Sequence, residues 1–141
     1  MINGVIAQKL QHIDTVLTEL RSLGFLTVQD LEKDWRTKRA VERSLQILVE
    51  IVIDVCQRIL SRLGQSPATT GRDAVDRVIA LGILGQLDAY SKMVQFRNFV
   101  VHRYEQVDNV ILVDMVNRRL VDFESFRNEI LAYVKRILHE D

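Results

Sequence analysis

Hydrophobic residues recur every three or four positions along most of the chain, which is the period of an α-helix rather than of a β-strand. The pattern predicts a first helix over about 3–20 and a fourth over about 86–102. Only the stretch 65–72, which holds the lone Pro67, has clear loop chemistry. We therefore predict an all-α fold, an up-and-down bundle of about five helices, in a single domain over residues 1–141.

Polar and glycine residues mark the ends of the predicted helices. Thr27 and Asp30 have the spacing of a capping box, and from them a long helix can run to Leu63 without a breaker. Asp108 is a good N-cap for a last helix over about 109–138. Gly24 and Gly64 are expected to end helices in a left-handed backbone conformation. Asp73 is expected to cap a third helix that ends near Leu81, and a break is expected near Gly85.

The apolar positions of the three longest patterns define the predicted core. They are Val5, Ile6, Ile13, Leu17 and Leu20 in the first helix; Leu31, Trp35, Leu45, Leu48, Val49, Val52, Cys56, Ile59, Leu60 and Leu63 in the second; and Val110, Val113, Val116, Leu120, Phe123, Phe126, Ile130, Val134 and Ile137 in the last.

Composition excludes several classes of protein. The chain is 48% hydrophobic and carries 19 basic against 19 acidic residues, which argues against disorder and against an extended basic nucleic-acid coat. One cysteine cannot form an internal disulfide, and no Cys/His cluster has zinc spacing. No signal peptide and no apolar run of membrane-spanning length are apparent. We therefore expect a soluble, cytoplasmic protein without a metal or other cofactor.

Arg97 interrupts the apolar face of the fourth predicted helix. On a helical wheel, Tyr90, Met93 and Val94 surround it, whereas Lys92 falls on the opposite side. A guanidinium keeps its charge and is costly to bury alone, so it needs a buried acid, a wet cavity or an anionic ligand. Taken alone, the pattern favours an ion pair with a core acid such as Asp54 or Glu50.

Two further polar residues, Asn98 and His102, follow Arg97 on the same predicted helix. They are four residues apart and therefore share one side of it. Arg97 and His102 are five apart, which separates them by about 140° in an unbroken helix. They can therefore converge on one ligand only if the helix loosens near His102, or if a second subunit supplies a copy.

The string RNFVVHRY at 97–104 resembles the R-N-x3-H-x-Y signature of HepT-like proteins, which belong to the HEPN superfamily of small all-α ribonucleases. The segments 93–96, 105–111 and 120–123 are similar too, and the likeness in length and helix order extends over essentially the whole chain.

The resemblance implies a metal-independent endoribonuclease toxin that forms a homodimer, with two motifs meeting in a cleft at the interface. Arg97 would bind the scissile phosphate of the RNA substrate. His102 would handle the proton of the attacking ribose 2′-OH, and Asn98 would orient the substrate or the histidine. These roles suit an imidazole and a guanidinium.

The resemblance also implies a partner, a nucleotidyltransferase (MNT) antitoxin that silences the toxin by AMPylation of Tyr104. Larger hetero-oligomers with that antitoxin are also consistent with it. The alternative is a non-catalytic HEPN module that binds a nucleotide or a partner, in which Arg97 and His102 hold a phosphate without cleaving anything. A scaffold with no site would leave this polar set unexplained.

The remaining polar residues favour structural interpretations. His12 and His139 are expected on a helix surface and in a frayed tail, and Cys56 in the core. Asp73, Asp76 and Asp88 are too loosely spaced to indicate a metal. The basic run Arg36, Lys38, Arg39 and Arg43 is expected to be a solvated helix face, with RNA phosphates as a second hypothesis for it.

Overall fold

Seven helices form the described part of the computed structural model, which covers residues 4–85, 87–102 and 108–140, with the side chains at 87, 98–102 and 138–140 outside it. The helices are α1 (Gly4–Arg21), α2 (Val28–Lys33), α3 (Trp35–Arg62), α4 (Gly71–Ala80), α5 (Leu87–His102), α6 (Asn109–Arg118) and α7 (Leu120–Glu140). The predicted all-α fold is confirmed, with two more helices than expected. None of the described helices combines the length and hydropathy of a membrane span.

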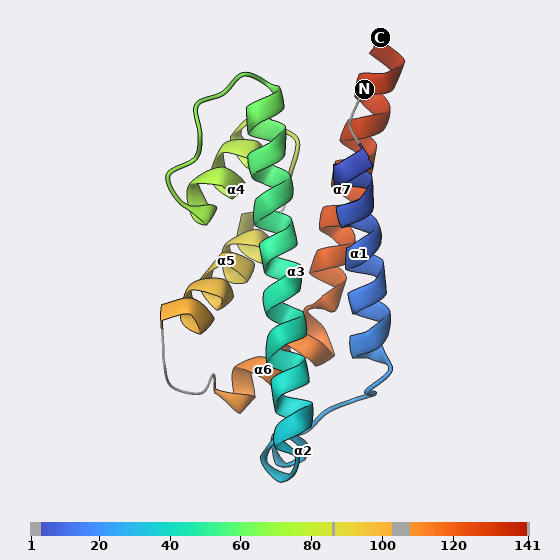
Figure 1. The fold of residues 1–141 in the computed structure, drawn as a ribbon, viewed down its shortest axis with the longest axis vertical. Helices are drawn as coiled ribbons and strands as arrows, with labels where there is room; N and C mark the ends of the chain where they lie inside the picture. The colour runs from blue at the N-terminus through green and yellow to red at the C-terminus, as the bar shows by residue number, and fades with distance from the viewer. Residues whose placement is uncertain (1–3, 86, 103–107, 141) are drawn as a thin grey trace.

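The long helix α3 is the centre of the molecule (Figure 1). α1 lies against it on one side with α7 beside α1, while α4 and α5 contact its other side. α2 and α6 close the lower end of the view. Most predicted core positions are buried as expected, and Val113, Val134 and Ile137 pack at the edge of the core.

Two predicted helices are each divided in the structure. Asp34 ends α2 and begins α3: its backbone is extended, its N–H donates to the Asp30 carbonyl, and its carboxylate accepts from the Arg36 N–H at 3.0 Å. An aspartate that bonds nearby backbone N–H groups favours such a cap over helix continuation. Arg119 separates α6 from α7, where the chain turns to run beside α1 (Figure 1).

Three residues predicted for the core are exposed instead: Trp35 at 68%, Leu63 at 43% and Val110 at 60%. Each lies in a terminal turn of a helix or just beyond one, where helical spacing no longer determines which side faces the core. Trp35 is covered on one face by the Arg36 guanidinium, 5.8 Å from the ring centroid.

The capping predictions are mostly confirmed. Thr27 and Asp30 form the reciprocal capping box, and Asp108 caps α6 by accepting from the Val110 N–H at 2.8 Å. For α4 the prediction is wrong: Thr70, rather than Asp73, is the N-cap, and its hydroxyl accepts from the Asp73 N–H. The end predicted near Leu81 is confirmed, since α4 ends at Ala80 with Leu81 as its C-cap, ahead of the break expected near Gly85. The turn comes at Gly82, whose φ of 79° is left-handed.

Candidate functional site

Arg97 lies on α5 among apolar neighbours, as the helical wheel predicts. Tyr90, Met93, Val94 and Phe96 are all buried on this helix, whereas Lys92 and Gln95 on its other side are exposed. Arg97 itself is half-buried. α5 therefore inserts a permanent cation at the margin of the core.

The Arg97 guanidinium is only partly satisfied. Its Nε is buried and has no hydrogen-bond partner among the described residues. The acids proposed as partners are engaged elsewhere: the Asp54 carboxylate contacts Lys9 and Arg58, both at 2.9 Å, and Glu50 accepts from Gln46 at 3.0 Å. The structure thus gives no support to the core ion pair that the sequence pattern alone favours.

A recess of about 580 Å³ opens beside Arg97. It is lined by Gln57 of α3, Ala68 and Thr69 of the preceding loop, Thr70, Gly71 and Arg72 at the start of α4, and Arg97. Among the residues that the structure describes, this lining contains two guanidinium groups and no carboxylate, which is the lining expected of a site for anions.

Asn98 and His102 lie in the last turns of α5, which is helical through His102. The loosening of the helix before His102 that would let Arg97 and His102 converge in one chain is therefore absent. In an unbroken helix, positions five residues apart are separated by about 140° around the axis. The side chains of Asn98 and His102 lie outside the described residues, as does Tyr104 altogether.

Three tyrosines occur in the chain, and two of them are buried. Tyr90 is fully buried, with its ring edge-on to Phe126 at 5.9 Å. Burial raises the pKa of the Tyr90 phenol, and the Glu129 carboxylate adds to this shift. Tyr133 is only 8% exposed. The Tyr90 hydroxyl is itself a buried atom, so a modifying enzyme cannot reach it without local unfolding.

The other singled-out residues occupy structural positions. Cys56 is buried, and burial raises the pKa of its thiol, while His12 is exposed on α1. The side chain of His139 lies outside the described residues. Asp73 and Asp76 contact Arg77 and Arg72, and no cluster suited to a metal occurs in the part of the chain that the structure describes.

The basic run on α3 is only partly solvated. Arg36, Arg39 and Arg43 are exposed, as expected. Lys38 is buried, with only 9% of its surface exposed. The prediction of a solvated face is therefore wrong for Lys38.

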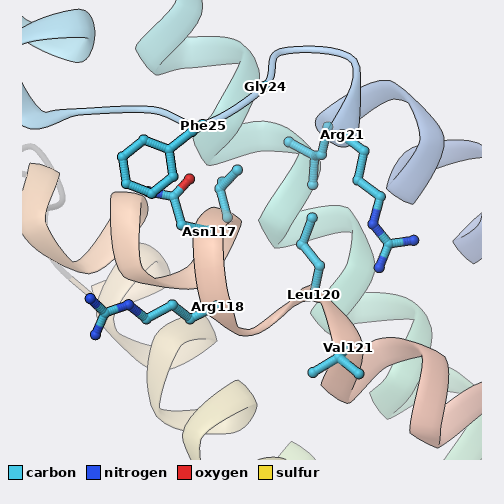
Figure 2. A pocket seen from close by; sticks show the side chains of 9 residues that line it. Arg21, Gly24, Phe25, Asn117, Arg118, Leu120 and Val121 are labelled. Carbon is cyan, nitrogen blue, oxygen red and sulfur yellow. The ribbon is translucent and has the colours of Figure 1, made fainter.

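A second pocket, of about 340 Å³, lies between the α1–α2 connection and the α6–α7 turn (Figure 2). Phe25, at 79% exposure, and Arg118 are among its lining residues. It includes none of the motif residues. The hydrophobic pattern gave no sign of it, because Phe25 falls in a connection between helices.

Comparison with known proteins gives consistent matches. A family model described as "Ribonuclease HepT-like" matches residues 13–130. The chain is similar to the mRNA nuclease HepT of Shewanella oneidensis, with 26% identity over 133 residues, which are 93% of this chain and 99% of that protein.

Two solved structures of toxin–antitoxin systems are similar over nearly their full length. One is a tri-AMPylated Shewanella oneidensis HEPN toxin in complex with an MNT antitoxin, with a TM-score of 0.82, 26% identity, and coverage of 93% of this chain and 99% of that one. The other is a toxin–antitoxin with AMP-PNP, with a TM-score of 0.82, 25% identity, and coverage of 92% and 99%.

Proposed function

Because the chain belongs to the HepT-like ribonuclease family, we propose that it is an endoribonuclease toxin that cleaves RNA without a metal ion. The similar mRNA nuclease HepT supports RNA as the substrate class. Residues 1–141 act as one domain in this proposal, and the protein acts in the cytoplasm.

The observation that carries the proposal is the state of Arg97. A guanidinium whose buried Nε has no partner among the described residues lies beside a recess whose described lining has no carboxylate. A charge held in this way is stabilised by an anionic ligand, and RNA supplies one in each phosphate. Arg97 is also the first residue of the motif on which the family resemblance rests.

In the proposed reaction His102 accepts the proton of a ribose 2′-OH, and the 2′ oxygen attacks the neighbouring phosphorus. The bond from phosphorus to the 5′ oxygen breaks, and that oxygen takes up a proton. Arg97 stabilises the charge that develops on the phosphoryl oxygens, and Asn98 orients the substrate or the histidine. The products are a 2′,3′-cyclic phosphate and a 5′-hydroxyl end, and the substrate itself supplies the nucleophile.

We propose that each site combines two chains. Since α5 is helical through His102, positions 97 and 102 lie about 140° apart around one helix axis. A two-fold homodimer that brings two α5 helices together would place Arg97 of one copy near His102 of the other.

The proposed partner is a nucleotidyltransferase antitoxin that silences the toxin by attaching AMP to Tyr104. The similar HEPN toxin is tri-AMPylated and bound to an MNT antitoxin, which supports this regulation. Burial of Tyr90 and Tyr133 leaves Tyr104 as the tyrosine to test. Hetero-oligomers larger than a 1:1 complex are compatible with a homodimeric toxin.

The experiment is RNA cleavage by the purified protein in EDTA, with wild type beside Arg97→Ala and His102→Ala. We expect cleavage by the wild type only, with cyclic-phosphate ends. Mass spectrometry must first show that Tyr104 carries no AMP, because a silenced enzyme would be inactive too. An unmodified, dimeric wild type that leaves RNA intact would instead indicate the nucleotide- or partner-binding module.

A further inference from the structure

The recess beside Arg97 contains a second arginine from a different helix. Arg72 is the second residue of α4, whereas Arg97 lies on α5, and both line the same recess. Two positive charges that line one cavity repel each other. An anion bound between or beside them offsets this repulsion. Arg72 is outside the R-N-x3-H-x-Y motif.

The contacts that Arg72 makes within the chain are long. Its Nε is 3.7 Å from Asp76, both side chains are nearly half exposed, and its terminal nitrogen is 3.5 Å from the Ser91 hydroxyl on α5. An exposed ion pair one helical turn apart contributes little stability. A guanidinium also has five N–H donors. Arg72 can therefore donate hydrogen bonds to an anion while its contacts within the chain lose little stability.

The other polar residues that the structure describes in the lining of the recess are uncharged. Thr69 and Thr70 bring hydroxyl groups and Gln57 brings a side-chain amide. The nearest carboxylate on the first turn of α4, Asp73, is itself occupied: it accepts from the Thr69 N–H at 3.1 Å and lies 3.6 Å from Arg77. In its described lining the recess therefore combines two cations with uncharged hydroxyl and amide groups, of which the Thr69 hydroxyl lies 3.5 Å from Asp73.

The start of α4 is fixed against α3, so the recess is formed before any ligand arrives. A Cβ on Gly71 would lie 2.7 Å from the Cδ1 of Ile53, which is 7% exposed. The absence of a side chain on Gly71 lets the backbone approach α3 this closely, whereas a Cβ would have to displace the end of the Ile53 side chain. This close packing holds Arg72, the next residue, at the rim of the cavity that Arg97 also lines.

We propose that Arg72 and the recess bind a second phosphate of the RNA strand, next to the phosphate on which Arg97 acts. This subsite rests on the proposed ribonuclease function and extends it. A single strand carries one phosphate per nucleotide, so an enzyme holding one of them meets the next a nucleotide away. Arg72 binds and positions the strand without touching the reacting atoms.

The test is binding of a short RNA oligonucleotide in which every 2′-OH is methylated, so that it binds but cannot react. Its fluorescence anisotropy is followed across a salt series for wild type, Arg72→Ala, Arg72→Lys and Arg118→Ala. Arg118→Ala removes the same charge at the pocket of Figure 2 and is the matched control.

For Arg72→Ala we expect affinity to fall about tenfold and the slope of log K against log salt to shrink by about 0.7, the value for one single-strand phosphate. Arg72→Lys retains the slope but recovers only part of the affinity, because an ammonium loses the two-pronged contact. With cleavable RNA the loss falls mainly on KM. A substrate that ends before the second phosphate should not distinguish Arg72→Ala from wild type.

Wild-type affinity and slope in a folded Arg72→Ala protein would overturn the subsite, as would an equal loss in Arg118→Ala, which would indicate a general charge effect. The two proposals can fail separately. If unmodified wild type leaves RNA intact while Arg72→Ala still binds the oligonucleotide less tightly, the ribonuclease function fails and the phosphate subsite stands.

Discussion

Asn117 on α6 binds both backbone polar groups of Leu26, a residue 91 positions earlier in the chain. The Leu26 N–H donates to Oδ1 of Asn117 at 3.1 Å, and Nδ2 of Asn117 donates to the Leu26 carbonyl at 2.8 Å. One side chain thereby fixes the α1–α2 connection to α6 at the pocket of Figure 2.

Asn117→Ala should lower the free energy of unfolding by about 1–3 kcal/mol, because two partly buried backbone groups lose their partner. Urea unfolding followed by circular dichroism measures this change. Asn128→Ala, an exposed position on α7, is the control and should change stability by less than about 0.5 kcal/mol. Equal effects of the two substitutions would show that the contact with Leu26 contributes nothing particular.

Arg97→Met should separate stability from activity. Methionine fills a similar volume without a buried, unpartnered Nε, so we expect the free energy of unfolding to be unchanged or to rise by about 1 kcal/mol. RNA cleavage should fall at least about 100-fold, because the cation that stabilises the phosphoryl charge is lost. Chemical denaturation and a cleavage assay on the same sample measure both. A destabilisation of about 3 kcal/mol would indicate that Arg97 is a paired structural charge.

Mixing two inactive variants tests whether a site needs two chains. In a heterodimer of Arg97→Ala with His102→Ala, one of the two shared sites keeps both native residues. After subunit exchange the mixture should regain about a quarter of wild-type cleavage, since half the dimers are mixed and half their sites are intact. Each variant alone is the control. No recovery, with exchange verified by native mass spectrometry, would place both residues of a site in one chain.

Stability should decrease at acidic pH through the Asp54 cluster that joins α1 to α3. Partial burial would raise the pKa of Asp54, but contacts from Arg58 and Lys9 outweigh it and hold this pKa below the usual 3.8. A carboxyl with a lowered folded-state pKa stabilises the protein above its unfolded value and loses that contribution as pH falls through the folded value. Urea unfolding at pH 7, 4 and 3 should show Asp54→Asn less stable than wild type at pH 7, with a difference that becomes smaller at pH 4 and smaller again at pH 3. Asp88→Asn, at an exposed position on α5, is the control.

Tyr104→Phe should leave the toxin active in the presence of its proposed antitoxin. Coexpression with a nucleotidyltransferase and ATP should add AMP to the wild type, visible as a mass increase on the peptide that contains Tyr104. Phenylalanine lacks the acceptor oxygen, so its mass stays constant and cleavage continues. Tyr133→Phe removes the hydroxyl of a buried tyrosine and is the control, and this variant should be modified like wild type. AMP on the Tyr104→Phe protein would identify a different acceptor.

The sequence predicted the helical class because the apolar period extends through most of the chain. It did not predict the breaks at Asp34 and Arg119, since each lies inside an uninterrupted apolar pattern. At Asp34 the competing force is local, a carboxylate that caps the helix after it. At Arg119 the chain redirects so that α7 can pack along α1, a tertiary requirement that no short pattern encodes.

For the candidate site, too, the sequence shows what depends on one helix and not what depends on the packing of several. The helical wheel identified Arg97 from its position on an apolar face, and that position is confirmed. The recess could not be predicted, because it joins α3, α4 and α5. Arg72 falls in a segment that the sequence indicates to be a loop, whereas the structure places it in the first turn of α4. The TTGR run at 69–72 was the available signal, since a threonine before the predicted helix is a good N-cap.

The continuous helix through His102 has a consequence for dosage. In the proposed two-chain site no single chain completes the catalytic centre, so the centre is absent at high dilution and forms only when two chains meet. Below the dissociation constant of the dimer, the rate of RNA degradation should therefore increase with the square of toxin concentration. A cell making a few surplus copies would experience little damage, and harm would begin at a threshold set by the dimer affinity.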